Sequence, residues 1–323
     1  MLTPSQVLSA LPVALDRVHV PRIPVRRGAV RDSFDLPDGR RVIIATDRFT
    51  VFGRQVGLVP YKGQVLNQLT NWWFEHTADI LPNYVIDVPD PNVTIALTAT
   101  PLPITVRVHG YLSGETAADL WARYRDGERV LDGVEFPDGL RKNQELPQPL
   151  VTAVAKRVGR VLERALTQAE IVALGVHPAL WERIQEAALK LFLRGRSLCL
   201  LADLILVYSR YEFGVDFNGD LLLIDDLHTP ESSRFWRAAT YVECLEGGDE
   251  PEHFDREFVD AWYRAQGYGE GDALPPLPAK LIVAISRRYQ RVYERITGHA
   301  FRPAGYPARR RIAVALRYAQ VVG

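Results

Sequence analysis

Two adjacent carboxylates, Asp225 and Asp226, follow a run of four apolar residues, and a third acid, Glu212, lies in the preceding segment. The dipeptide Asn218-Gly219 between them is a strong signal for a β-hairpin turn. If the flanking segments pair as antiparallel strands, Glu212 and Asp225 can converge on one face of the hairpin. Mg²⁺ prefers carboxylate oxygens and often bridges phosphate oxygens, so the pair predicts a magnesium site. From spacing alone another interpretation stays open, in which one acid is solvated at the strand end and the other caps the turn.

The elements that must hold this hairpin alternate between strand and helix patterns along the chain. Apolar and alternating runs bounded by glycine and proline predict strands in the first third, including a hairpin at 27–49 that turns at 37–40. Helical spacing of apolar residues predicts a helix at 62–81, and strand character returns at 92–112. The remaining predicted segments are a helix at 115–125, a loop at 126–149, a long helix at 178–202, the hairpin at 203–226, and helices at 252–266 and 279–298.

Composition and charge restrict the class of protein. The 323 residues are 47% hydrophobic, and Lys plus Arg number 39 against 39 for Asp plus Glu, so the formal net charge is zero. A neutral chain is not built to coat nucleic acid or an anionic membrane. Cys199 and Cys244 are too few for a disulfide scaffold or a cysteine-rich zinc site. Because we find no signal-peptide pattern and no apolar run long enough for a membrane span, we expect a cytoplasmic protein. A homo-oligomer stays open.

Several motifs, taken in order along the chain, resemble those of one enzyme family. They include RGAVRDSFDL, IIATDRFTVFG, PYKGQVLNQLTNWWF, GYLSGE, FPDGLRKNQELPQPLVTAVAK and YEFGVDFNGDLLLIDDLHTPESSRFW. From residue 24 to residue 300 their order and spacing are similar to those of the SAICAR synthetase family. The resemblance implies an α+β fold with a nucleotide cleft between two parts. These are a β-rich N-terminal part at 1–112 and a larger α/β part with C-terminal helices at 113–323.

The resemblance also implies an activity with its cofactors and partners. In the family, ATP phosphorylates a carboxylate, and the amine of aspartate then displaces phosphate to form an amide. A carboxylate is a poor electrophile, so the acyl phosphate supplies a leaving group, while Mg²⁺ neutralises the phosphate charge. We therefore expect a ligase that uses ATP and Mg²⁺ to join a small-molecule carboxylate to an amino acid.

The family motifs assign roles to residues of this chain position by position. The expected metal ligands are Glu212 and Asp225, with Asp226 beside them. The expected nucleotide-binding residues are Gly28, Arg31, Asp47 and Arg48. The expected catalytic residues are Lys156, Arg210 and Arg234, and the expected substrate-binding residues are His109, Glu115, Tyr208, Ser232 and Ser233. An arginine fork suits a carboxylate or a phosphate. Lys62 matches a family motif without an assigned role.

This chain departs from the family pattern at several positions that are usually charged or bind phosphate. Ala29, Thr98 and Thr100 stand where lysines are usual. His109 replaces an arginine, and Glu115 replaces a serine that helps to hold the substrate's phosphate. Each lost charge-assisted hydrogen bond is worth roughly 1.5–3 kcal/mol, and a carboxylate repels a phosphate dianion. We therefore predict an altered carboxylate substrate, as in specialised nucleoside or natural-product biosynthesis.

Two alternatives for the function stay open. The first is the orthodox SAICAR synthetase reaction of purine biosynthesis. The second is a non-catalytic binding relative or an ATP-independent enzyme on the same scaffold, because the missing lysines remove charge that would balance ATP. Two histidines are also ambiguous: His109 can be a general base or a structural side chain, and His228 can contact metal or substrate or be a turn residue. Trp72 and Trp73 have helical spacing and are assigned to the core.

Overall fold

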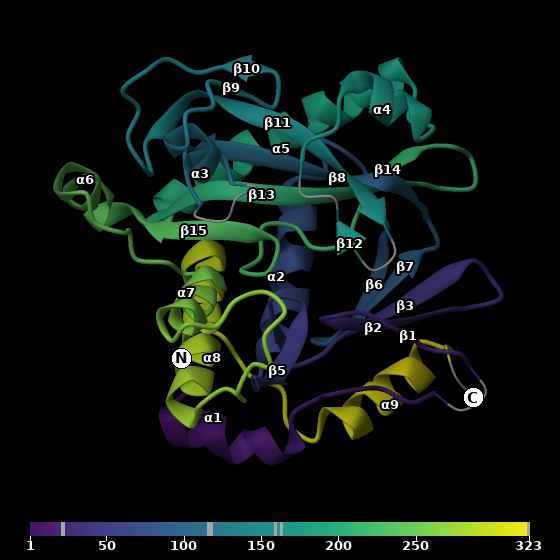
Figure 1. The fold of residues 1–323 in the computed structure, drawn as a ribbon. Helices are drawn as coiled ribbons and strands as arrows, with labels where there is room; N and C mark the ends of the chain where they lie inside the picture. Colours follow the sequence, from purple (N-terminus) through teal and green to yellow (C-terminus); the bar gives the residue numbers. More distant parts are fainter. Residues whose placement is uncertain (21–22, 115–118, 158–159, 162–163, 322–323) are drawn as a thin grey trace.

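Two large antiparallel sheets, with helices around them, make up the structure (Figure 1). It is a computed structural model that describes residues 1–20, 23–114, 119–157, 160–161 and 164–321. Strands and helices are both extensive and no parallel strand pairing builds either sheet in the described residues. The predicted α+β class is therefore confirmed.

The larger sheet has six strands among the described residues. Their order is β12-β11-β8-β13-β14, and β15 also pairs with β13. The strands are β8 (Thr100–Tyr111), β11 (Glu145–Arg157), β12 (Arg160–Val161), β13 (Leu204–Val215), β14 (Leu221–Ile224) and β15 (Ser233–Arg237). The hairpin predicted around Asn218-Gly219 is confirmed, with β13 paired to β14 and Gly219 at φ +85°. Glycine adopts this left-handed conformation without steric cost.

The smaller sheet has five strands in the order β1-β2-β3-β7-β6 within the described part of the chain. They are β1 (Arg26–Arg27), β2 (Arg31–Asp35), β3 (Arg40–Ala45), β7 (Val93–Leu97) and β6 (Val85–Asp90). The hairpin predicted at 27–49 corresponds to β2 and β3. Two short ribbons complete the strands: β4 (Arg48–Val51) with β5 (Arg54–Leu58), and β9 (Val130–Leu131) with β10 (Val134–Glu135).

Helices lie where the sequence predicts them at 62–81, 178–202, 252–266 and 279–298, and further helices occur elsewhere in the described chain. Their bounds are α1 (Pro4–Ala10), the 3-10 turn η1 (Leu11–Val13), α2 (Lys62–His76), α3 (Leu120–Arg125), α4 (Gln168–Ala173), α5 (Pro178–Leu201), α6 (Ala238–Gly247), α7 (Glu257–Ala265), α8 (Ala279–Thr297) and α9 (Ala308–Tyr318). The helix predicted at 62–81 ends earlier, because Thr77 leaves the helical conformation at φ −132°. Among the described residues, no helix has the length and apolar character needed to cross a membrane.

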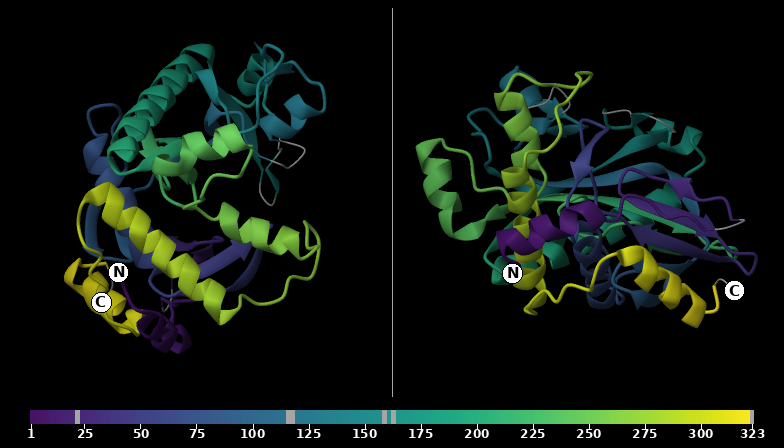
Figure 2. Two further views of the ribbon diagram at one scale, coloured as in Figure 1. Left: turned by 90° about the vertical axis from the view of Figure 1, so that its left-hand side faces the viewer. Right: turned by 90° about the horizontal axis from the view of Figure 1, so that it is seen from below.

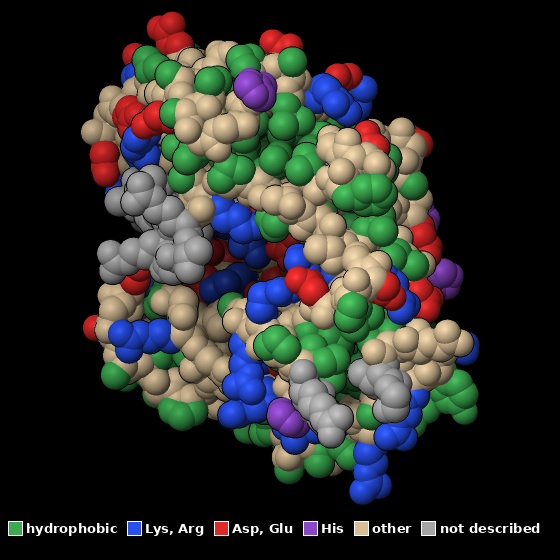
Figure 3. Space-filling view, turned by 90° about the vertical axis from the view of Figure 1, so that its right-hand side faces the viewer, with side chains coloured by type: hydrophobic (Ala, Val, Ile, Leu, Met, Phe, Trp, Pro, Cys, Tyr) green, Lys and Arg blue, Asp and Glu red, His purple; other side chains and the backbone are tan. Residues whose placement is uncertain are grey.

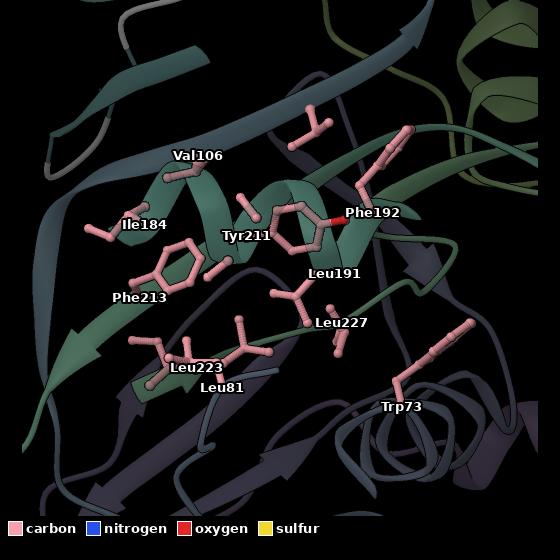
Figure 4. Close-up of a cluster of buried hydrophobic side chains, with 14 of the residues drawn as sticks. Trp73, Leu81, Val106, Ile184, Leu191, Phe192, Tyr211, Phe213, Leu223 and Leu227 are labelled. Carbon is pink, nitrogen blue, oxygen red and sulfur yellow. The ribbon is translucent and has the colours of Figure 1, made fainter. Parts of the chain in front are cut away.

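The main hydrophobic core lies between α5 and one face of the six-stranded sheet. Figure 4 shows its side chains, with Leu191 and Phe192 of α5 beside Val106, Tyr211 and Phe213 of the sheet. Alternate residues of the paired segments enter this core, at Ile104, Val106 and Val108 of β8 and at Tyr211 and Phe213 of β13, because successive side chains of a strand point to opposite faces. In these segments the residues between them, including Thr105 and Glu212, point to the other face.

Helix α2 joins the two sheets. Its residues Leu69 and Trp73 are fully buried in the core of the six-stranded sheet, and the same core includes Ile43 of β3. This placement confirms the core assignment of Trp73. Figure 1 shows α2 running from the larger sheet toward the foot of the molecule.

The chain passes from the smaller sheet to the larger one before residue 112, where the resemblance implied a boundary between two parts, and that boundary stays a prediction. β8 belongs to the larger sheet, so the change of sheet falls between Leu97 and Thr100. The C-terminal helix α9 also packs on the smaller sheet, where its residues Ile312 and Leu316 share a core with Phe34. Figure 2 shows α9 alongside that sheet. Because β-pairing is decided by distant partners, periodicity alone did not reveal either feature.

Candidate active site

One face of the six-stranded sheet carries polar side chains, and we call it the polar face. Residues that lie opposite each other on β8 and β13 share it, in the pairs Thr105 with Glu212, Arg107 with Arg210, and His109 with Tyr208. β11 adds Thr152, which lies opposite Arg107, and strand alternation places Lys156 on the same face. Five residues predicted or ambiguous in the sequence are therefore brought onto one surface, together with residues that the motifs did not indicate.

Glu212 and Asp225 lie at one end of the polar face, and cations lie against them. Lys156 Nζ is 2.6 Å from Glu212 Oε2. Arg31, on β2 of the smaller sheet, pairs with both Asp225 and Asp226. Arg31 and these acids therefore connect the two sheets through charge.

The two candidate metal ligands have different electrostatic surroundings. Glu212 is buried, and burial raises its pKa although Lys156 opposes the shift. Burial acts in the same direction on Asp225, but Arg31, Arg210 and Lys156 outweigh it and hold the pKa of Asp225 below its usual value. Asp225 is therefore a permanent anion near neutral pH, whereas the charge of Glu212 depends on a cation close by.

The two acids fit an Mg²⁺ ion that also binds phosphate oxygens. Mg²⁺ at nucleotide sites keeps several waters and takes only one or two carboxylates. No group of three or more His, Cys, Asp or Glu suited to a metal occurs in the part of the chain that the structure describes. Lys156 and Arg31 balance the acids with positive charge of the kind that an ion would supply. The metal assignment stays a prediction with which the donor set agrees.

Asp47, predicted to bind nucleotide, points into the protein. It is fully buried, and its carboxylate accepts hydrogen bonds from Leu15 N at 2.7 Å, from Gly63 N at 3.1 Å and from the Tyr306 hydroxyl at 2.7 Å. Gly63 is in the first turn of α2, where backbone N–H groups have no helical partner. Asp47 therefore holds the start of α2, and its contact with nucleotide stays a prediction.

Arg48 stabilises the turn that contains Gly28 through hydrogen bonds to its backbone. Its guanidinium donates hydrogen bonds to the carbonyl oxygens of Gly28 at 2.9 Å and Ala29 at 3.4 Å and to the Asp32 carboxylate at 2.7 Å. Gly28 N donates to Arg31 O at 2.7 Å, which closes the turn. Arg48 and Gly28 thus position Arg31. Their contact with nucleotide also stays a prediction.

A cavity of about 140 Å³ lies at the other end of the polar face. It is lined by Arg107, His109, Asp119, Leu120, Asp132, Thr152, Val154, Ala165, Tyr208 and Arg234. Three predicted residues meet here. The rings of His109 and Tyr208 are 4.8 Å apart, and the Arg234 guanidinium is 5.4 Å from the Tyr208 ring. The cavity and the acid pair are therefore two ends of one surface.

His109 does not supply charge to this cavity. Burial, assisted by Arg107 and Arg234, lowers the pKa of His109 to about 3, so its imidazole is neutral near pH 7. The permanent cations lining the described cavity are Arg107 and Arg234, and Arg234 lies 3.4 Å from Asp119. Glu115, predicted beside them, lies outside the described residues.

Three other predicted residues have partners within the chain. Ser232 Oγ accepts a hydrogen bond from Thr229 N at 3.1 Å, and the hydroxyls of Ser233 and Ser209 are 2.8 Å apart. Both serines are buried. The backbone N–H of Arg210 donates to Ser232 O at 3.0 Å, which ties the serine segment to β13. Substrate contact by the serines and a catalytic role for Arg210 stay predictions.

The motifs missed several residues of the polar face. Arg107, Asp119 and Thr152 line the cavity but lie outside the positions to which the family resemblance assigned roles. Arg107 had a detectable signal, because it lies two residues before His109 on one strand and alternation places both on one face. Asp119 reaches the cavity from the start of α3, and nothing in its local sequence indicated this.

His228, the second ambiguous histidine, lies on the opposite side of the sheet. It is fully buried, its Nε2 is 2.8 Å from the Tyr211 hydroxyl, and its ring is perpendicular to that of Trp73 at 4.6 Å. Burial lowers the pKa of His228 to about 3. Its side chain therefore contacts the core.

Acidification is expected to destabilise the protein through His228. In the unfolded chain this imidazole binds a proton near its usual pKa of 6.5, whereas in the folded protein it does so only near 3. Its contribution to stability is therefore complete above pH 6.5 and is lost as the pH falls toward 3. At pH 5 the loss is about 2 kcal/mol. Urea unfolding at pH 7 and pH 5 checks this. Between the two pH values, the free energy of unfolding should fall by about 2 kcal/mol more in wild type than in His228→Gln. Equal decreases in the two proteins would contradict the prediction.

The charged side chains between the two sheets lie in a hollow of the molecular surface. Seen from the side in Figure 3, the molecule is hollowed at its centre, and Lys, Arg, Asp and Glu side chains gather there. A hollow with fixed charges of both signs suits a small anionic ligand that is held with a cation.

The amino-acid sequence is similar to that of one enzyme family and of individual enzymes in it. Residues 24–274 match the SAICAR synthetase family model. A putative phosphoribosylaminoimidazole-succinocarboxamide synthase 2 of Mesorhizobium japonicum is 42% identical over 291 residues, which cover 90% of this chain and 93% of the relative. A phosphoribosylaminoimidazole-succinocarboxamide synthase of Legionella pneumophila is 42% identical over 294 residues, with coverage of 90% and 93%.

Solved structures agree with this at the level of the fold. SAICAR synthase from Saccharomyces cerevisiae complexed with SAICAR matches with a TM-score of 0.77 at 24% identity, covering 90% of this chain and 100% of that chain. A SAICAR synthetase in complex with ADP matches with a TM-score of 0.66 at 22% identity, covering 87% and 100%. With the family model matching most of the chain, this protein belongs to the SAICAR synthetase family.

Proposed function

We propose that this chain is an ATP-dependent ligase that joins the phosphorylated aminoimidazole carboxylate of purine biosynthesis to the amine of aspartate. The relatives that are 42% identical carry the name of this reaction. The observation on which the proposal depends most is the paired charges of Glu212 with Lys156 and Asp225 with Arg31, between the two sheets. Such a site suits phosphoryl transfer, which needs positioning and charge stabilisation more than covalent chemistry from the protein.

The proposed ligase reaction has two steps. A carboxylate oxygen of the substrate attacks the terminal phosphorus of ATP, which forms an acyl phosphate and releases ADP. The aspartate nitrogen then attacks the acyl carbon, phosphate leaves with the bonding electrons, and the nitrogen loses a proton. Glu212 and Asp225 would hold Mg²⁺, which neutralises phosphate charge. Lys156 and Arg31, already at these acids, place further positive charge where phosphate oxygens would lie.

The relatives support the orthodox reaction better than the altered carboxylate that the sequence analysis favoured. That hypothesis rested on the lysines missing at Ala29, Thr98 and Thr100, on the arginine missing at His109, and on the carboxylate of Glu115, which lies outside the described residues. The structure bears on the change at His109. In the structure, Arg107 lies on the same face two residues earlier and lines the same cavity with Arg234. Two guanidinium groups therefore remain where an anionic substrate group would enter. We infer that the usual phosphorylated substrate is retained.

A direct assay tests the proposed function. The purified chain is mixed with Mg·ATP, the phosphorylated aminoimidazole carboxylate and aspartate, and the products are separated by mass spectrometry. We expect equal amounts of ADP and of the amide, and neither product when the carboxylate is omitted. When aspartate is omitted we expect no amide, and ADP only from the first step, in which the acyl phosphate forms. Amide formation from a different acid only, or Mg·ATP binding without any amide, would overturn the proposal. The second outcome would favour a binding relative.

A further inference from the structure

The spacing of Glu212 and Asp225 must be maintained by contacts beyond the two strands themselves. Glu212 is on β13, whereas Asp225 follows the last residue of β14, where ladder pairing has ended. Tyr211 precedes Glu212 and points to the opposite side of the sheet, because strand residues alternate. His228 follows Asp225 by three residues and also lies on that side, in contact with Tyr211.

Tyr211 and His228 are joined by a hydrogen bond behind the two acids. The Tyr211 hydroxyl and His228 Nε2 are 2.8 Å apart, and both side chains are fully buried. Figure 4 shows Tyr211 among the apolar side chains beside α5, and Trp73 of α2 at another part of the same core. The bond therefore links the strand that carries Glu212 to the segment that carries Asp225, in a place that water does not reach.

This arrangement costs stability in three independent ways. His228 Nδ1 is buried without a hydrogen-bond partner among the described residues, which is unfavourable for a polar atom. The backbone is left-handed at His228, with φ +44°, and at Asp225, with φ +67°. Gly195 of α5 must lack a side chain, since a Cβ there would lie 2.4 Å from His228 Cε1. Strain of this kind persists where the surroundings enforce it, and it is common at functional sites.

Helix α2 contacts two residues of the segment from Asp225 to His228. Thr70 Oγ1 donates to Asp226 Oδ1 at 3.0 Å, and the ring of Trp73, three residues later, packs perpendicular to His228. Residues three apart lie on one face of a helix. The segment from Asp225 to His228 is thus fixed from α2 on one side and from Tyr211 on the other.

We propose that Tyr211 and His228 are positioning residues that set the separation of Glu212 and Asp225 for metal-nucleotide binding. The inference rests on the proposed function only in that the two acids receive a metal-bound phosphate. Neither Tyr211 nor His228 would touch the nucleotide. Their effect would pass through the backbone to the acids on the opposite face.

The test is the affinity for ADP with and without Mg²⁺, measured by calorimetry on the full chain. Tyr211→Phe keeps the ring and removes the hydroxyl. We expect it to weaken Mg·ADP binding about tenfold, as loss of outer contacts to a metal site typically does, while metal-free ADP binding stays unchanged. His228→Gln can still reach the Tyr211 hydroxyl and should keep an affinity close to that of wild type.

Tyr263→Phe is the matched control, because the Tyr263 hydroxyl also donates a hydrogen bond within the protein, to Pro275 O at 2.7 Å, away from the acids. If both Phe variants lower Tm and leave Mg·ADP affinity unchanged, the Tyr211–His228 pair is only core packing and the inference is wrong. Absence of Mg·ADP binding by wild type would also overturn it. Mg·ADP binding by wild type without amide formation would instead reject the proposed function and leave this test valid.

Discussion

Replacing Glu212 by glutamine is expected to lower kcat for Mg·ATP-dependent amide formation by about 10²–10³-fold, as loss of one preorganised charge-stabilising group does. The amide keeps the size of the side chain and can still accept the hydrogen bond that Thr105 Oγ1 gives at 2.7 Å. It removes the negative charge that would hold Mg²⁺ and that now pairs with Lys156. Steady-state kinetics with saturating Mg·ATP measure the effect.

The same substitution should leave stability unchanged or raise it slightly. Burial raises the pKa of Glu212, so its charged form is held at a cost to folding. Asp220→Asn is the matched control, since it makes the same chemical change in an exposed turn residue of the same hairpin. We expect this control to keep wild-type kcat and Tm. A Glu212→Gln variant that retains more than about a third of wild-type activity would reject the role assigned to Glu212.

The largest effect on stability is expected at Lys62. This lysine begins α2, is fully buried, and lies 3.0 Å from Glu231 Oε1. Burial lowers the pKa of Lys62. At Glu231, burial would raise the pKa, but the charges of Lys62 and Arg256 outweigh it and the pKa of Glu231 is lowered. Lys62→Met would leave the Glu231 carboxylate with the Tyr289 hydroxyl at 3.0 Å and Arg256 at 3.9 Å. We expect a loss of about 3–5 kcal/mol in the free energy of unfolding.

Urea unfolding of two further variants separates charge from packing. Lys62→Met combined with Glu231→Gln should recover much of the loss, because no unpaired charge then stays buried. Lys190→Met breaks an exposed pair with Glu186 and should change nothing measurable. If the double variant is less stable than Lys62→Met alone, the loss comes from packing around Lys62 and the explanation by buried charge is wrong.

Lys62 also shows how stability and the site are linked. Its partner Glu231 immediately precedes Ser232, Ser233 and Arg234, the segment that enters the cavity at Arg234. The buried pair therefore ties α2 to this segment. The motif resemblance included Lys62 but assigned it no role. Its buried pair with Glu231 indicates a structural role, in which Lys62 fixes α2 relative to the segment that carries Arg234.

Local sequence was sufficient to predict the hairpin of β13 and β14, the helices α2 and α5, and the family. The Asn218-Gly219 turn predicted the hairpin that puts Glu212 next to the end of β14, because only residues tolerant of positive φ make such turns. The apolar periodicity predicted α2 and α5 because one face of each helix is buried. The motif order predicted the family and the α+β fold, both of which are confirmed.

Tertiary structure alone decided the partners of the charged residues. Arg31 reaches Asp225 across 194 residues of sequence and from the other sheet, so no local pattern could indicate that pairing. Asp47 had the type of a ligand-binding residue, yet its carboxylate is used to hold the chain around α2. Residue type and alternation specify which face a side chain occupies. What lies opposite it depends on how the sheets and helices pack together, and that is a property of the whole chain.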